Sequence, residues 1–121
     1  MSIEHYIERG IDIVTAKSLM MCHLVEARES IKQIIRDGSG RIVLDLSLVK
    51  FMDGSGLGLP VSMLQQARRR GGDVHLVMSN THNSVTELFK LCRLNTVFRV
   101  FPDVAGAINA FSLDQNPSPP T

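Results

Sequence analysis

Residues 41–58, RIVLDLSLVKFMDGSGLG, decide the fold of this 121-residue chain. They open with an uninterrupted apolar run, Ile42, Val43 and Leu44, which is typical of a strand buried on both faces in the middle of a sheet. Asp53 and three glycines within residues 54–58 follow, and the apolar spacing then becomes helical. The stretch therefore predicts a strand, an exposed turn and a helix amino terminus, where free backbone N–H groups and the positive end of the helix dipole point outward.

The composition is that of one ordinary folded domain, with 44% apolar and 21% charged residues. The net charge of +1 excludes a general attraction to nucleic acid or to membrane surfaces. No apolar run is long enough to span a bilayer, and the chain has no Trp and one Tyr for stacking bases. Cys22 and Cys92 lack metal-ligand spacing. With no signal peptide visible, we expect both to be buried free thiols in a cytoplasmic protein.

Before the central stretch, the pattern predicts one strand and one helix. Residues 2–8 alternate weakly and indicate an edge strand, while residues 11–14 either extend a strand or lead into the helix. Residues 16–36 have apolar side chains at intervals of three and four, as in an amphipathic helix. Asp12 or Thr15 could cap this helix, and a glycine-rich segment ends it.

After the central stretch, strands and helices continue to alternate. A helix is expected over residues 55–70, where Pro60 predicts a distorted first turn or a start near Leu57. The remaining expected elements are a strand at 74–78, a helix at 82–93, a strand at 96–101 and a helix that begins at 102.

This alternation predicts an α/β fold with a mostly parallel sheet of four to five strands and about four helices, in which the N-terminal strand is antiparallel. We assign residues 1–112 to one domain. Residues 113–121 form a polar, proline-rich tail that we expect to be disordered.

The glycine turn at residues 54–58 has two interpretations from the residues alone. One is a phosphate cradle, but the spacing is G-x-G-x-G rather than G-x-G-x-x-G, and the next strand ends at Met78 without an acid for a ribose. A small nucleotide-binding protein is therefore a lesser alternative. The other is a turn where glycine eases tight packing, which does not explain why Asp53 and Ser55 occur together at the helix start.

Several segments, in order, resemble the STAS domain, the family of bacterial anti-sigma-factor antagonists. Residues 11–16, IDIVTA, resemble its G-R-L-D-x-x-T-A segment ahead of the first helix. Residues 43–47, VLDLS, resemble its V-L-D-L-S strand, and residues 51–58, FMDGSGLG, resemble its F-[IM]-D-S-[ST]-G-L-G signature. Gly71 and Gly72 before a strand, and residues 94–98, also fit. The series is more specific than any single motif.

The resemblance implies a STAS-like fold and a binding switch that needs no cofactor and performs no catalysis. The unmodified domain docks on an anti-sigma factor with a serine-kinase fold, and phosphorylation at the helix start releases it. A phosphate adds about −1.5 to −2 charges and three acceptor oxygens, enough to disrupt an interface. The residues it places on the docking face are Asp12, Asp53, Gly54, Ser55, Gly56, Leu57 and Gly58.

One position departs from the family pattern. The usual phosphate acceptor directly follows the signature Asp, and here that residue is Gly54, which has no hydroxyl. Either Ser55 takes the phosphate, or the domain is not switched in this way and stays competent to bind. Helix capping is the structural alternative for Ser55.

Other functions remain open at this point. A STAS subunit of a transporter ATPase or of a sensory scaffold would suit Gly54 well. The N-terminal part looks short for the family, so an edge strand could be missing and the open edge could pair with a second copy. The four histidines show no ligand spacing, so we expect structural or surface roles and no metal site.

Overall fold

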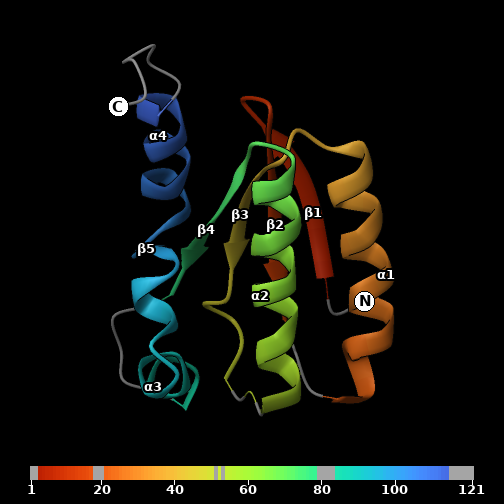
Figure 1. Cartoon of the computed structure of the whole chain (residues 1–121), viewed down its shortest axis with the longest axis vertical. Helices are drawn as coiled ribbons and strands as arrows, with labels where there is room; N and C mark the ends of the chain where they lie inside the picture. The colour runs from red at the N-terminus through yellow and green to blue at the C-terminus, as the bar shows by residue number, and fades with distance from the viewer. Residues whose placement is uncertain (1–2, 18–20, 51, 53, 79–83, 115–121) are drawn as a thin grey trace.

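The computed structural model describes residues 3–17, 21–50, 52, 54–78 and 84–114, with the backbone alone described at 21–24, 55 and 112–114. Five strands and four α-helices alternate along this part of the chain (Figure 1). The elements are β1 (Ile3–Glu8), β2 (Ile11–Ala16), α1 (Met21–Asp37), β3 (Arg41–Asp45), α2 (Gly54–Arg69), β4 (Asp73–Val77), α3 (Ser84–Leu91), the 3-10 helix η1 (Leu94–Thr96), β5 (Arg99–Phe101) and α4 (Val104–Asp114).

The strands form one sheet in the order β1-β2-β3-β4-β5, parallel except for the antiparallel pair β1–β2. Arg9 (φ 54°) and Gly10 (φ 75°) make the tight turn between β1 and β2. The family's hairpin is therefore present, and the expectation of a missing edge strand was wrong. Asp12 and Thr15 lie inside β2, so neither caps α1.

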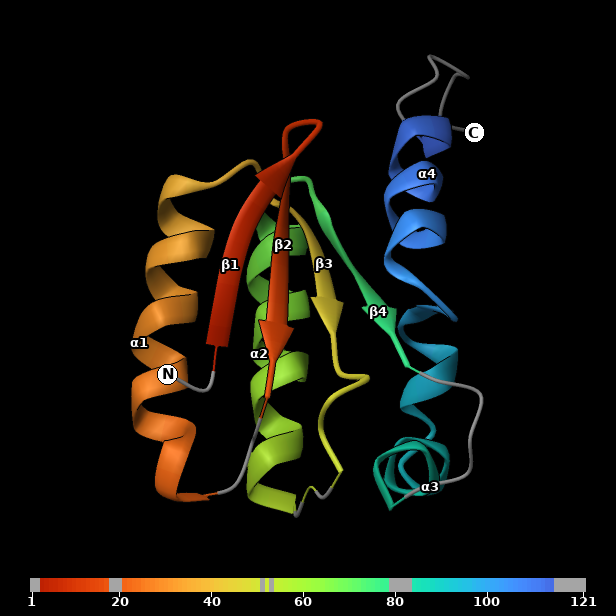
Figure 2. The same cartoon turned by 180° about the vertical axis from the view of Figure 1, so that it is seen from behind.

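The core has two layers because helices cover both faces of the sheet. Helices α1 and α2 pack on one face, where Ile42 and Leu44 of β3 point, and α4 packs on the other, where Val43 points (Figures 1 and 2). All three β3 side chains are fully buried. The apolar run at residues 42–44 therefore predicted a central strand correctly.

Helix α2 begins at Gly54 and continues past Pro60 to Arg69. The expected start near Leu57 was wrong. Leu59, Met63 and Leu64 are buried on its inner side, and this packing holds the helix against the sheet despite the proline.

The segment after α3 differs from the sequence-based expectation. Helix α3 ends at Leu91, η1 includes Thr96, the first residue of the predicted last strand, and β5 has only the three residues Arg99–Phe101. Cys92 follows the end of α3 and is an exposed free thiol. Its expected burial was wrong because the helical periodicity does not extend to this position. The side chain of Cys22 lies outside the described residues.

His75 of β4 is completely buried and anchors α4. Its Nδ1 donates a hydrogen bond to the carbonyl of Ala107 (2.9 Å), and its ring stacks on Phe111 with centroids 3.6 Å apart. The structural role expected for a histidine is confirmed here. This contact joins the last helix to the sheet.

A close backbone approach fixes the turn before β4, and it generates a test of the packing. A Cβ atom at Gly72 would lie 1.9 Å from the Gly40 carbonyl oxygen, whereas a Cβ at Gly58 would have no neighbour within 4 Å. Gly72→Ala should therefore lower the free energy of unfolding by about 1–3 kcal/mol. Gly58→Ala, in an exposed helix position, should raise it by about 0.5–1 kcal/mol. Urea denaturation of both variants measures the difference, and equal effects would contradict this packing.

Candidate docking face at the amino end of helix α2

The site forms where the carboxyl ends of the parallel strands meet the amino end of α2, at the bottom of Figure 1. Strand β3 ends at Asp45, whose Oδ1 accepts hydrogen bonds from the N–H (2.9 Å) and the hydroxyl (2.5 Å) of Ser47. This Asx-type turn redirects the chain out of the sheet. Asp45 therefore has a structural role at the end of β3.

The segment between β3 and α2 is anchored at several points. Leu46 N–H donates to the Val77 carbonyl (2.9 Å), and the Lys50 carbonyl accepts a hydrogen bond from the Ser84 hydroxyl at the start of α3 (2.8 Å). Val49 is buried, while the side chain of Leu48 is 56% exposed. Residues 46–50 are therefore held in place, and they present an apolar side chain, Leu48, to solvent.

The glycines at the start of α2 leave an open helix surface. Gly54 and Gly58 are exposed, and a Cβ at either would meet nothing within 4 Å. Neither glycine is needed for internal packing, so the interpretation that they ease tight packing was wrong at these positions. Gly56 is buried and Leu57 half-buried. The backbone of α2 can thus be approached closely from outside at Gly54 and Gly58.

Two predicted site residues cannot be placed fully. Asp53 and the Ser55 side chain lie outside the described residues. The backbone of Ser55 is the second residue of α2, and the helix begins before it. Ser55 therefore lies inside the helix and is not its N-cap residue, which corrects the expected capping role of Ser55.

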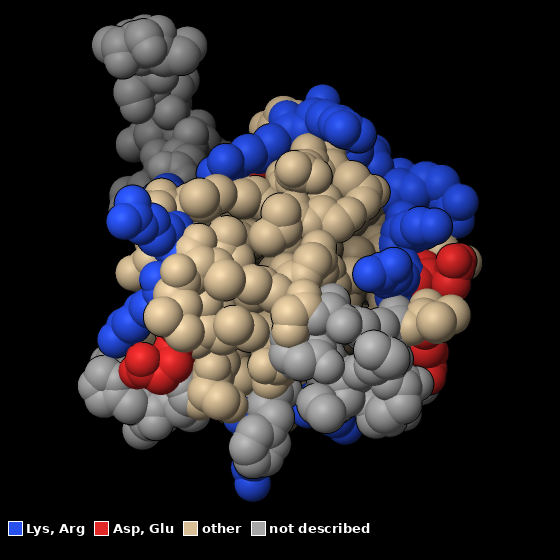
Figure 3. All heavy atoms as spheres, turned by 60° about the horizontal axis from the view of Figure 1, so that its bottom comes forward, with Lys and Arg blue, Asp and Glu red and all other residues tan. Residues whose placement is uncertain are grey.

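This end of the molecule is mostly uncharged in the middle and charged at the edges. Figure 3, which brings this end forward, shows mostly uncharged atoms with Lys and Arg, and fewer Asp and Glu, around the margin. Between α1 and α2, a pocket of about 280 Å³ is lined by Arg28, Lys32, Gly58 and Gln66, among others. Sequence reasoning missed these α1 residues, because the pairing of α1 with α2 is not visible in the α2 motif.

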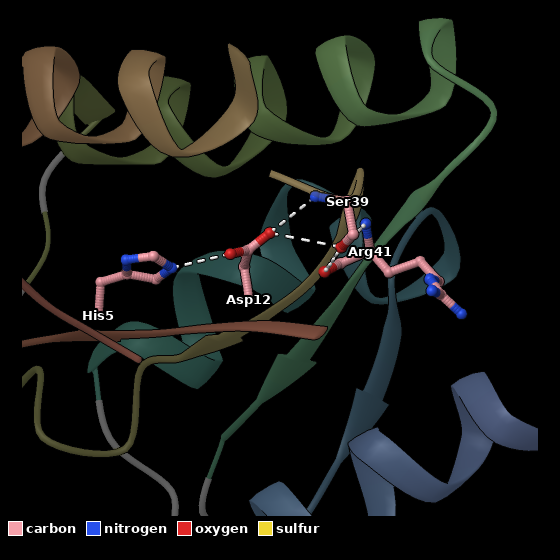
Figure 4. Close-up of polar contacts among 4 residues, drawn as sticks. All are labelled: His5, Asp12, Ser39 and Arg41. Atoms are coloured by element: carbon pink, nitrogen blue, oxygen red, sulfur yellow. Dashed lines mark hydrogen bonds and ion pairs between the residues drawn. The ribbon is translucent and has the colours of Figure 1, made fainter. Parts of the chain in front are cut away.

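Asp12 lies elsewhere, which corrects its predicted place beside the docking face. It is the second residue of β2 and is paired with Ile42 near the start of β3, so it sits at the opposite end of the sheet from Gly54. It is 2% exposed. One carboxylate oxygen contacts His5 Nε2 (2.8 Å), and the other accepts the Ser39 N–H (3.1 Å) and hydroxyl (3.4 Å) (Figure 4).

The family model of the STAS domain matches residues 3–107, most of the chain. The chain belongs to the STAS domain family. Solved relatives agree with this fold. An anti-sigma factor antagonist from Mycobacterium paratuberculosis has a TM-score of 0.80 at 19% identity, covering 89% of this chain and 91% of that one. SpoIIAA in its unphosphorylated form has a TM-score of 0.74 at 18% identity, covering 91% and 96%.

A third STAS neighbour is the Bacillus cell fate determinant SpoIIAA in its phosphorylated form, with a TM-score of 0.67 at 16% identity and coverage of 90% and 98%. At these identities the structural likeness shows the fold alone. Within the described residues of this STAS chain, no group of His, Cys, Asp or Glu side chains could hold a metal ion. No helix among those residues is both long and apolar enough to cross a membrane.

The burial of Asp12 predicts a structural role. Asp12→Ala leaves His5 and Ser39 without their acceptor and should lower the free energy of unfolding by about 2–3 kcal/mol. Asp37→Ala removes an exposed carboxylate near the same end and should stay within about 0.5 kcal/mol of the wild type. Urea denaturation distinguishes the two. An Asp12→Ala variant as stable as the wild type would refute this assignment.

Proposed function

We propose that this STAS domain is a non-enzymatic protein-binding regulator that docks on an anti-sigma factor with a serine-kinase fold. The docking face is the amino end of α2 with the preceding turn. The observation that carries the proposal is the open helix surface at Gly54 and Gly58, which the protein's own packing does not require. The names of the solved relatives, anti-sigma factor antagonists, support the same class of partner.

The chemistry of the face suits a protein partner. Absent side chains at Gly54 and Gly58 let a partner's backbone approach, and the exposed Leu48 of the segment before α2 offers apolar area to bury. Arg28 and Lys32 line the pocket beyond Gly58 and can meet acidic groups at the rim. The helix amino end also favours an acidic or carbonyl-rich partner surface.

Gly54 makes constitutive binding the favoured mode. The family's acceptor hydroxyl is missing, although the structure has room for a side chain at this position, so packing does not force its loss. We infer a domain that stays in its binding-competent state. Ser55, one residue later, is the remaining candidate phosphate acceptor.

Negative charge at the helix start should disrupt the complex. Gly54→Asp and Ser55→Asp should each weaken binding to a kinase-like anti-sigma factor from the same genome by about tenfold or more, through desolvation and repulsion at the interface. Asn109→Asp adds the same charge on α4, on the other face of the sheet, and should leave the affinity unchanged. Isothermal titration calorimetry measures all three. Unchanged affinity in both helix-start variants would count against this face.

Restoring the hydroxyl should restore the switch. Gly54→Ser fits without a clash and should be phosphorylated by the kinase-like partner faster than the natural chain. Labelling with radioactive ATP, followed by mapping of the modified residue, tests this, and Gly54→Ala is the control without a hydroxyl. Full phosphorylation of the wild type on Ser55 would overturn the constitutive mode.

A second candidate rests on the same glycine. A STAS subunit of a transporter ATPase or of a sensory scaffold needs no phosphate acceptor, which agrees with Gly54. Affinity purification from the native cell separates the two candidates. Recovery of an ATPase subunit without a sigma regulator would favour the second.

A further inference from the structure

Strand β1 is an edge of the sheet, and its hairpin determines which backbone groups face outward. The turn at Arg9 and Gly10 has two residues, so Glu8 and Ile11, which flank it, exchange both backbone hydrogen bonds. Hydrogen-bonded pairs alternate along an antiparallel ladder. The N–H and C=O groups of every second residue, Ile3, His5 and Ile7, therefore point away from β2 toward the open edge.

Helix α1 overhangs this edge. Figures 1 and 2 both place α1 to the outside of β1. A groove of about 510 Å³ lies between them, lined by His5 and Ile7 of β1, Asp12 of β2, and Gln33 and Asp37 of α1, among others. Ile7 is 65% exposed, so the groove can be entered from solvent. One added strand would run along β1 and beneath α1.

Asp12 and Asp37 line the groove, and no Lys or Arg is among its described lining residues. Asp12 is 2% exposed, and Arg36, which is not among the lining residues, lies 3.6 Å from the exposed Asp37 carboxylate. On the other face of β1, Glu4 and Glu8 point away from the groove. The Nζ of Lys17 lies 2.6 Å from Glu4 and lowers the pKa of that carboxyl through a hydrogen bond and its charge. His5 is held by Asp12, and Asp37 is exposed at the rim.

We propose that this groove binds an extended basic peptide segment of another protein, which adds a strand to β1 and places alternate Lys or Arg side chains beside Asp37. Main-chain hydrogen bonds to Ile3, His5 and Ile7 supply affinity. The carboxylates that line the groove favour basic over acidic side chains of the peptide. The carboxylates lining the groove on a chain of net charge +1 make basic peptide the complementary class.

A second copy fits less well than a single strand. Antiparallel pairing of two β1 strands about a two-fold axis would keep both α1 helices on the same face of the joined sheet. Because each helix overhangs its own edge, both would occupy the strip above the seam, where packed helices need 8–10 Å between axes. A peptide brings no helix of its own. The groove shares no described lining residue with the pocket beside Gly58, so its test is independent of the proposed function.

The probe is the hexapeptide Lys-Val-Lys-Val-Lys-Val, capped at both ends and matched in length to β1. In the register that places its lysines opposite Ile3, His5 and Ile7, all three lysines point toward the groove. Amide chemical shifts of the ¹⁵N-labelled protein should change along β1 and α1. The Glu-Val counterpart, and the Lys-Val peptide with N-methyl groups on alternate residues, should cause no saturable shifts.

Protein variants locate the contacts. Asp37→Lys reverses the rim charge and should weaken binding by about fivefold or more. Ile7→Pro removes an outward N–H that β2 does not use and should abolish binding while the fold is kept, as circular dichroism checks. Glu87→Gln, on α3, should change nothing.

The proposal would be overturned if the Lys-Val peptide did not bind saturably, or if the Glu-Val or N-methylated peptide bound equally well. The same chemical-shift changes from butylamine alone would also overturn it and would indicate a pocket for small cations. A dimer in sedimentation velocity that Ile7→Pro converts to a monomer would overturn it as well and would indicate a second copy.

Discussion

The structure depends on the burial of β3 on both faces. Ile42 and Leu44 pack under α1 and α2, and Val43 packs under α4. A strand of this kind must lie in the middle of a sheet with helices on both sides, so its neighbours are parallel strands reached through helical crossovers. The carboxyl ends of β2, β3 and β4 then point to one end of the molecule, where the chain must turn outward before α2. The proposed docking face is a consequence of that geometry.

The two ends of the sheet differ in how tightly they are packed. At the end where the parallel strands start, a buried carboxylate, Asp12, joins β1, β2 and the segment before β3 through His5 and Ser39. Close backbone contacts, such as that between Gly40 and Gly72, lie at the same end. At the other end, Gly54 and Gly58 of α2 are exposed, and a Cβ at either would meet nothing within 4 Å. Tight packing therefore lies at one end of the sheet, and open backbone lies at the other, where the docking face is proposed.

Much of the fold could be predicted from the sequence, because its strands and helices follow the local periodicity of apolar residues. The apolar run of β3 and the helical spacing of α1 and α2 indicated the sheet and its layers. The place of Asp12 could not be predicted, because it depends on where residues 11–14 turn, and a two-residue turn at Arg9 and Gly10 made them a full strand. The exposure of Cys92 was also missed, since helical spacing does not show where α3 ends. The role of Arg28 and Lys32 depends on contact between two helices, and no local pattern encodes it.

The central claim is that a partner covers the amino end of α2. Hydrogen–deuterium exchange of the complex with a kinase-like anti-sigma factor tests it most directly, because the first amides of a helix have no internal acceptor and exchange quickly when free. The account predicts that binding protects the turn after β3 and the first turn of α2, with little change in α4. Protection confined to other elements, with the start of α2 exchanging as fast as in the free protein, would contradict it.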